Sequence, residues 1–318
     1  MSKDNPNWER ETITELAWEG LREKRRARRW SIFFKLLMFL YLIAVLFAFS
    51  DWPKTDALPG KSHTALIKVK GIIADGADAS AEQINALLRK AFSSHNTKGV
   101  VLEINSPGGA PVQAASIYQE IRRLRKKHKD IPLYAVVSDL CASGGYYVAA
   151  AADKIYAAKA SIVGSIGVRM DSFGVTRLAD KLGIESRTIT AGENKALLDP
   201  FRPENPEQRA HLQNMLDQVH QLFISDVKAG RGDRLKTDAP GLFSGLIWTG
   251  EEAKRLGLID DFGDTDFVAR EVIGEKTVVE YEGKKDLLEQ LTSDFGGVAG
   301  EMMKKFSAAL FDKTPLPR

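Results

Sequence analysis

The order of apolar and polar positions divides the chain into one long apolar run near its start and a series of short periodic segments after it. Residues 32–49 are apolar except for Lys35, and a helix of that length spans about 27 Å, close to the thickness of the hydrocarbon core of a bilayer. The preceding stretch, 22–29, carries six basic residues and one acid. Because basic flanks stay in the cytoplasm, the pattern predicts a cytoplasmic N-terminus.

We interpret this run as an uncleaved transmembrane anchor at 31–50, since it ends without the small residues of a signal-peptide cleavage site. Proline and glycine after it are typical of a linker. The predicted organisation is a cytoplasmic basic segment at 1–30, the anchor at 31–50, a linker at 51–62, an outer domain at 63–282 and a C-terminal helical tail at 283–318.

Beyond the linker, segments with strand periodicity alternate with segments with helix periodicity. Strands are predicted at 64–70, 99–105, 133–138, 154–157, 185–190 and 277–281, and helices at 80–92, 112–129, 144–152, 175–182, 206–229 and 249–256. This alternation indicates parallel βαβ units, so the predicted fold class is α/β. Functional residues of such folds lie on loops at the carboxyl ends of strands. Two glycine-containing loops, 106–109 and 139–145, take that position.

Composition and charge narrow the classes of protein that fit. The 318 residues are 44% hydrophobic and 27% charged, as in ordinary globular proteins. A net charge of +3, with basic residues clustered near the N-terminus, does not favour nucleic acid as a partner. The single cysteine, Cys141, cannot form an intramolecular disulfide, and the five histidines form no His-Glu-x-x-His zinc motif.

Three turns rich in small residues are candidates for chemistry. Glycine amides in Ser106-Pro-Gly-Gly109 could bind a developing oxyanion or form an ordinary turn. Ser143 precedes an alanine-rich helix and two glycines, a position that suits a nucleophile and equally a helix N-cap. In Gly164-Ser-Ile-Gly-Val168, the hydroxyl of Ser165 could orient a nearby ammonium group, or the segment could simply be a tight turn.

A serine nucleophile needs a base, and histidine is the usual one. None of the histidines lies in a glycine-bounded loop after a predicted strand, and the Gly-x-Ser-x-Gly elbow is absent. Lysine can serve instead if burial lowers its pKa from about 10.4 by some 2–3 units. Lys195, in the loop before the long predicted helix, is a candidate for this role, although most loop lysines are simply solvated.

Five motifs, in order, resemble those of the short, single-repeat form of bacterial signal peptide peptidase A, a family of Ser/Lys-dyad serine peptidases in the ClpP/crotonase fold superfamily. They are Asn105-Ser-Pro-Gly-Gly109, Ala142-Ser-Gly-Gly-Tyr-Tyr147 with the following Ala-Ala-Asp-Lys154, Gly164-Ser-Ile-Gly-Val168, Leu178-Ala-Asp-Lys-Leu-Gly183 and the segment 192–200. The resemblance covers roughly residues 64–275. It implies a ClpP/crotonase-like fold of repeated β-β-α units.

The same resemblance assigns roles to particular residues. It implies that Ser143 is the nucleophile, that Lys195 is the general base and that Ser165 supports the lysine. The oxyanion hole would use the amide of Gly144 together with that of Gly109. Relatives often carry a third glycine where Ala110 and Pro111 stand, so the register is open by one residue and Gly108 is the alternative donor.

The resemblance also implies partners and location. Substrates would be cleaved signal peptides and similar hydrophobic peptides, and the chain would form a homo-oligomeric ring or dome in which neighbouring subunits can share the dyad. No metal, nucleotide or other cofactor is implied. The predicted protein is a single-pass serine endopeptidase of the bacterial inner membrane with its catalytic domain on the periplasmic side.

Three alternative functions stay open at this point. A related membrane peptidase of the same fold could act on other membrane-protein substrates. A non-catalytic membrane scaffold could keep the fold without the chemistry. A crotonase-type acyl-CoA enzyme is the third, and the outward topology argues against it because acyl-CoA is cytoplasmic.

Overall fold

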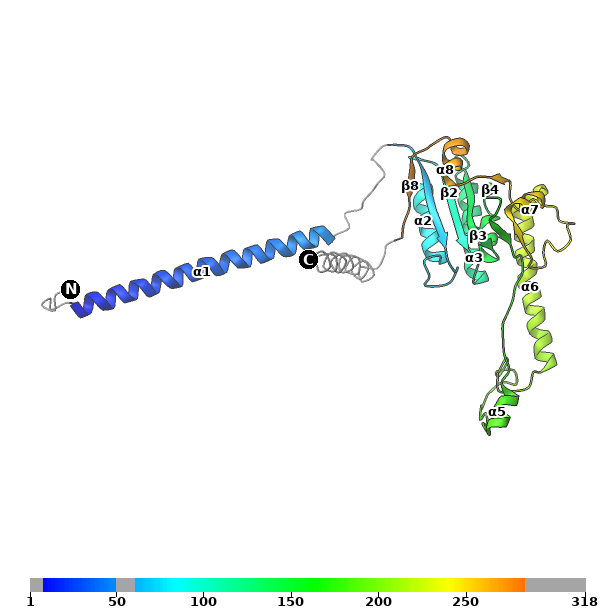
Figure 1. Cartoon of the computed structure of the whole chain (residues 1–318), viewed down its shortest axis with the longest axis horizontal. Helices are drawn as coiled ribbons and strands as arrows, with labels where there is room; N and C mark the ends of the chain where they lie inside the picture. The colour runs from blue at the N-terminus through cyan, green and yellow to red at the C-terminus, as the bar shows by residue number, and fades with distance from the viewer. Residues whose placement is uncertain (1–7, 50–60, 284–318) are drawn as a thin grey trace, which may run out of the picture. The chain divides into compact units, whose positions relative to one another are not determined.

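The structure is a computed structural model that describes residues 8–49 and 61–283 of the chain (Figure 1). Two compact units are present, residues 1–59 and 60–318. The predicted linker lies outside the described residues except for its last two positions, and the predicted C-terminal tail lies outside them except for Gly283.

The first unit contains one continuous helix, α1 (Trp8–Phe49). It joins the predicted basic segment to the apolar run, and its residues 22–42 are exposed. Of the helices in the described ranges, none has the length and apolar character that crossing a membrane requires. The anchor at 31–50 stays a prediction.

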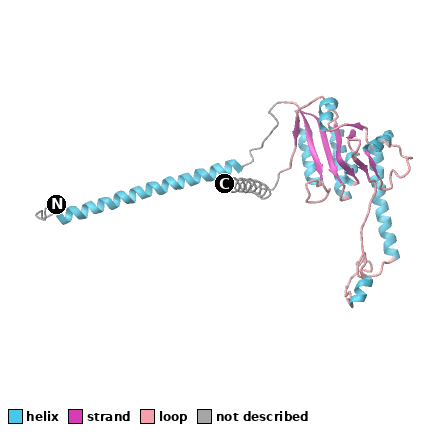
Figure 2. Cartoon of the chain, in the orientation of Figure 1, coloured by secondary structure: helices cyan, strands magenta, loops and turns pink. Residues whose placement is uncertain are grey.

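A mixed sheet forms the centre of the second unit (Figure 2). Its strands are β1 (His63–Lys70), β2 (Thr97–Ser106), β3 (Leu133–Ala142), β4 (Lys154–Ala157), β5 (Ile162–Gly164), β6 (Ile247–Thr249), β7 (Asp261–Phe262) and β8 (Val278–Glu280). The order is β6-β5-β3-β2-β1-β8, with β4 beside β3 and β7 beside β4. Every described pair is parallel except β5–β6. The α/β class with a parallel sheet is therefore confirmed.

The helices of this unit largely follow the predicted segments. They are α2 (Ala81–Ser93), α3 (Pro111–Lys127), α4 (Gly144–Ala149), α5 (Thr176–Leu182), α6 (Pro206–Arg231), α7 (Gly250–Arg255) and α8 (Thr265–Phe267), with the shorter turns η1 (Gly232–Arg234) and η2 (Val268–Ile273). Two of these helices begin at a side-chain cap: Ser80 accepts a hydrogen bond from the Gln83 amide, and Thr249 accepts one from the Glu252 amide.

Successive side chains of a strand point to opposite faces of the sheet, where they join two separate apolar clusters. On one face, Ile67 and Leu102 belong to the large core covered by α2, α3 and α4. On the other face, Leu66 and Val101 join a small cluster closed by Val268 of η2. Since the carboxyl ends of parallel strands meet at one edge, the loops after β2 and β3 lie together there.

Residues 168–205, which we call the arm, connect β5 to α6 and contain α5. Figure 1 shows α5 and the loop after it well away from the sheet, at the far end of α6. The strand predicted at 185–190 is wrong, because these residues form no strand and are all exposed. Ile189 is 96% exposed. A β-rich sequence needs a neighbouring strand to satisfy its backbone groups, and the described residues offer none here.

Candidate active site

Ser143 lies at the first position before α4, directly after β3. Its backbone has φ 52° and ψ −122°, a conformation that residues with a Cβ rarely adopt. Its amide donates to the Gly164 carbonyl at 2.8 Å. The half-buried hydroxyl makes no hydrogen bond with the described residues and does not cap α4. The N-cap interpretation of this hydroxyl is therefore wrong, and the group is free to react.

Three glycine backbones meet beside this hydroxyl. A Cβ built on Gly108 would lie 2.6 Å from the Gly144 nitrogen, and one on Gly144 would lie 3.2 Å from the Gly109 nitrogen. The Gly108 amide already donates to Ser106 Oγ at 3.1 Å. The amides of Gly109 and Gly144 have no acceptor among the described residues. Of the two candidate donors in this loop, the geometry thus favours Gly109 over Gly108. The free amides of Gly109 and Gly144 could together bind an oxyanion.

The loop is fixed by a segment that the sequence did not single out. Ile73, just beyond β1, donates its amide to the Gly108 carbonyl at 2.9 Å and accepts the Ala110 amide at 2.8 Å. A Cβ on Gly109 would stand only 2.0 Å from the Ile73 oxygen, so only glycine fits at this position. Gly71, which follows the first predicted strand, could have indicated from the sequence that this segment lies at the same edge of the sheet.

Ser165 is linked to Ser143 through the preceding residue, Gly164. Gly164 accepts the Ser143 amide, and the Ser165 amide donates to the Leu246 carbonyl at 2.7 Å. Ser165 also has a positive φ of 54°. Its half-buried hydroxyl makes no hydrogen bond with the described residues. Ser165 therefore directly follows the residue that accepts the Ser143 amide, and its role in supporting Lys195 stays a prediction.

Lys195 is not brought to this cluster within one chain. It is exposed on the arm, and its ammonium group makes no ion pair or hydrogen bond with the described residues. The preceding residue, Asn194, accepts a hydrogen bond from Gln208 in the first turn of α6. Phe223, which stacks on Tyr147 of α4, lies fifteen residues further along the same helix. That separation is about 22 Å along the helix axis.

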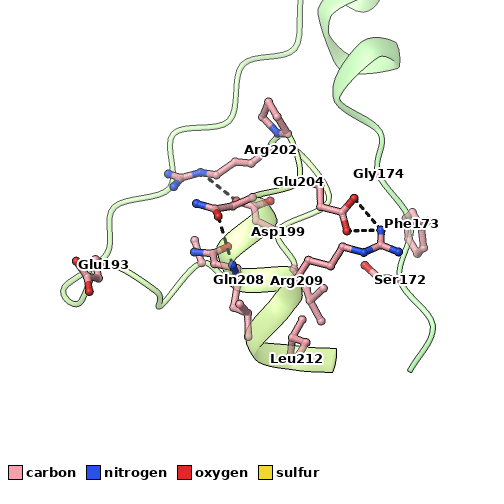
Figure 3. Close-up of a pocket in the computed structure, with 15 residues that line it drawn as sticks. Ser172, Phe173, Gly174, Glu193, Asp199, Arg202, Glu204, Gln208, Arg209 and Leu212 are labelled. Carbon is pink, nitrogen blue, oxygen red and sulfur yellow. Dashed lines mark hydrogen bonds and ion pairs between the residues drawn. The ribbon is translucent and has the colours of Figure 1, made fainter. Parts of the chain in front are cut away.

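A cavity also lies on the arm. It has a volume of about 670 Å³ and is enclosed by residues 172–174, the loop 193–205 and the start of α6 (Figure 3). Two ion pairs lie in its wall, Arg209–Glu204 at 3.0 Å and Arg202–Asp199 at 3.5 Å, as drawn in Figure 3. None of the glycines around Ser143 lines it. The cavity is therefore separate from the serine cluster.

Other reactive groups near Ser143 are unsuited to its role. Burial raises the pKa of the Cys141 thiol, so this neighbour stays protonated and is a poor nucleophile. Burial and the hydrogen bond to Asp226 raise the pKa of Tyr147 in the same way. In the ranges that the structure describes, His, Cys, Asp and Glu side chains form no group of three that could hold a metal ion.

A parallel α/β sheet that presents a free serine beside two free amides defines a candidate acyl-transfer protein. The family model described as Peptidase family S49 matches residues 125–278. The putative signal peptide peptidase SppA of Enterococcus faecium is 33% identical over 239 residues, which are 70% of this chain and 68% of that protein. A putative protease of Synechocystis is 33% identical over 67% of this chain and 73% of its own length. The chain belongs to peptidase family S49, which confirms the predicted resemblance at family level.

Other similarities cover less of the matched protein or are more remote. Two Brucella proteins named Na(+)/H(+) antiporter NhaA are 44% identical over 221 residues, so the match spans 68% of this chain and 30% of theirs. Most of the length of those two proteins therefore lies outside the match. Two mutants of the 1510-N membrane-bound stomatin-specific protease, one with a substrate peptide, align over 70% and 74% of the chain at 14% and 16% identity, each with a TM-score of 0.41.

Proposed function

We propose that this chain is a serine endopeptidase that cleaves hydrophobic peptides such as released signal peptides. The observation that carries the proposal is the free hydroxyl of Ser143 beside the free amides of Gly109 and Gly144. Membership of peptidase family S49 supports it. A scaffold without chemistry would have no need to keep a serine with φ 52° next to unsatisfied amides.

In the proposed mechanism, Ser143 Oγ attacks the peptide carbonyl while the neutral amine of Lys195 accepts its proton. The amides of Gly109 and Gly144 hold the tetrahedral oxyanion, and one such donor typically lowers the barrier by about 3 kcal/mol. The lysine then protonates the leaving amine, and an acyl-enzyme forms on the serine. Water, deprotonated by the same lysine, hydrolyses that ester, while Ser165 orients the ammonium group.

We further propose that the dyad is shared between subunits of a homo-oligomer. In one chain Lys195 lies on the arm, away from Ser143, so a neighbouring arm would have to supply it. Large apolar side chains exposed on the arm support this proposal, and they are Phe173, Leu178, Leu182, Ile184 and Ile189. Soluble monomers rarely expose so many together. Burial under a neighbouring subunit would also favour the neutral amine that catalysis requires.

The proposed location is the bacterial inner membrane, with the N-terminus in the cytoplasm and the catalytic domain on the periplasmic side. Its support is the sequence alone, namely the apolar run at 32–49 and the basic stretch at 22–29 before it. Fusing a periplasm-dependent reporter to the C-terminus would test the orientation. An inactive reporter there, with an active one at the N-terminus, would contradict it.

The test uses the full chain in detergent with a synthetic signal peptide and a hydrophilic peptide of equal length. Ser143→Ala and Lys195→Ala should each reduce cleavage by roughly a thousandfold or more. Ser93→Ala and Lys154→Ala, on exposed positions elsewhere, are matched controls that should leave cleavage unchanged. An active-site serine reagent should label the wild type and not Ser143→Ala. Full activity in either dyad variant, or preference for the hydrophilic peptide, would contradict the proposal.

A further inference from the structure

The helix that follows Gly109 and the helix that begins at Gly144 are both attached to one residue of α6. Gly109 precedes α3, and Tyr118 of α3 donates its hydroxyl to the Asp226 backbone oxygen at 2.8 Å. Gly144 begins α4, and Tyr147 of α4 donates its hydroxyl to the Asp226 carboxylate at 2.5 Å. Asp226 therefore holds both helices, one through its backbone and one through its side chain.

The same face of α6 contacts the remaining part of the cluster. Phe223 stacks on Tyr147 with ring centroids 4.6 Å apart, and Tyr147 lies 5.4 Å from the ring of Tyr118. One turn earlier, His220 Nε2 lies 3.0 Å from the carbonyl oxygen of Ile166, next to Ser165. Residues 220, 223 and 226 thus face the site at helical spacing. By these contacts α6 touches α3, α4 and the segment after β5.

Helix α4 is buried along its whole length, and the hydroxyl of Tyr146 also fixes it by donating to the Leu258 carbonyl oxygen at 2.8 Å. The helix is only six residues long. The Tyr147 amide donates to the Ser143 carbonyl at 2.9 Å, so a rotation of this helix moves the strained serine directly. Strained residues persist only where their surroundings determine them. The raised pKa of Tyr147, due to burial and Asp226, keeps its hydroxyl protonated as the donor.

From these contacts we propose that Asp226 is a positioning residue for catalysis. Acting through Tyr147 and Tyr118, it sets the spacing of α4 and α3 so that the amides of Gly144 and Gly109 converge on one oxyanion. The inference rests on the proposed peptidase function. It predicts that loss of the hydrogen bond between Tyr147 and Asp226 destabilises the transition state more than it weakens the binding of substrate.

The experiment compares Tyr147→Phe, Asp226→Ala and Asp226→Asn in the full chain. For each we would measure kcat and KM for a signal peptide, and the inhibition constant of a peptide aldehyde that forms a tetrahedral adduct. Tyr147→Phe and Asp226→Ala should lower kcat about tenfold or more, with KM within about twofold. Aldehyde binding should weaken by the same factor as kcat/KM. Asp226→Asn keeps an acceptor for the tyrosine hydroxyl and should restore most of kcat.

Tyr281→Phe is the matched control, because its buried hydroxyl bonds His63 at 3.0 Å, a residue at the start of β1. It should lower the unfolding temperature and leave kcat unchanged. Wild-type kcat in Tyr147→Phe, or a loss that spares aldehyde binding, would overturn the inference. Should Tyr147→Phe not fold, equal kcat in Asp226→Asn and Asp226→Ala would overturn it. Activity in Ser143→Ala would instead refute the underlying peptidase function.

Discussion

Ser143 combines an unfavourable backbone conformation with a hydroxyl that forms no hydrogen bond to the described residues. A φ of 52° in a residue with a Cβ costs of the order of 1–3 kcal/mol. Two backbone hydrogen bonds hold it there, one from its amide to Gly164 and one to its carbonyl from Tyr147. The strain points the hydroxyl away from the helix that it precedes, where an N-cap would otherwise use it.

Relief of this strain gives a prediction on stability. Ser143→Gly should unfold with a free energy about 1 kcal/mol higher than Ser143→Ala, because glycine adopts this conformation without a Cβ penalty. Both variants should lack peptidase activity. Thermal unfolding of the full chain in detergent measures the difference. A less stable glycine variant would show that the serine backbone carries no strain.

At Gly109 the main constraint is a close approach, in addition to a φ of 157°. Gly109→Ala would place a methyl group 2.0 Å from the Ile73 oxygen, so the loop must move and its amide must leave the oxyanion position. Cleavage should fall about a hundredfold or more, as for loss of an oxyanion donor. Gly274→Ala is the control, since that glycine has φ 79° and open space around it. Equal activity in the two variants would remove Gly109 from the proposed oxyanion hole.

At the scale of elements, a buried ion pair attaches α6 to the sheet, in addition to the tyrosine contacts with α3 and α4. Arg231, at the end of α6, is 1% exposed and donates to the Gly257 carbonyl and to the Asp260 carboxylate at 2.7 Å. The same carboxylate accepts the amide of Ile155 in β4. These contacts join the helix to β4 and to the loop before β7.

This ion pair should make stability depend on pH. Burial alone would raise the pKa of Asp260, but the hydrogen bond and charge of Arg231 lower it overall. Stabilisation is then present above the unfolded-state pKa of about 3.9 and is lost as pH falls toward the folded-state value. Asp260→Asn should flatten this acid dependence and cost about 3 kcal/mol at neutral pH, because Arg231 stays buried without its anion. Denaturant unfolding at neutral pH and at pH values below the unfolded-state pKa of about 3.9 measures both effects.

At the scale of the whole molecule, one chain provides a nucleophile with its oxyanion donors and a distant lysine. Ser143 lies at the edge of the sheet, whereas Lys195 lies on the arm at the other end of α6. If neighbouring subunits share the dyad, each active site belongs to two chains. Assembly and catalysis are then linked, because an isolated chain has no base beside its serine.

Mixing two inactive variants tests this arrangement. Oligomers assembled from equal amounts of Ser143→Ala and Lys195→Ala should recover about a quarter of wild-type activity, since a quarter of random junctions join an intact serine to an intact lysine. Oligomers of either variant alone should stay inactive. If the mixture is as inactive as its components, the dyad forms within a single chain, after a rearrangement of the arm.

Local pattern was enough to predict most of the elements and the candidate residues. The N-caps Ser80 and Thr249 were predictable because a cap depends on residues three positions apart. Strands β1 to β4 follow from apolar periodicity, and glycine-rich loops after strands indicated Ser143 and the 106–109 turn. The strands β5, β6 and β7 are two or three residues long, too short for a periodic signal.

The sequence by itself determined the α/β class, the position of the reactive loops and the residue types in them, because these depend on neighbours along the chain. Only the tertiary structure decided which amide is free, since Gly108 is engaged by Ser106 while Gly109 is held against Ile73. It also decided that 185–190 is not a strand and that Lys195 lies far from the serine. These outcomes depend on contacts between residues tens of positions apart, which no local pattern encodes.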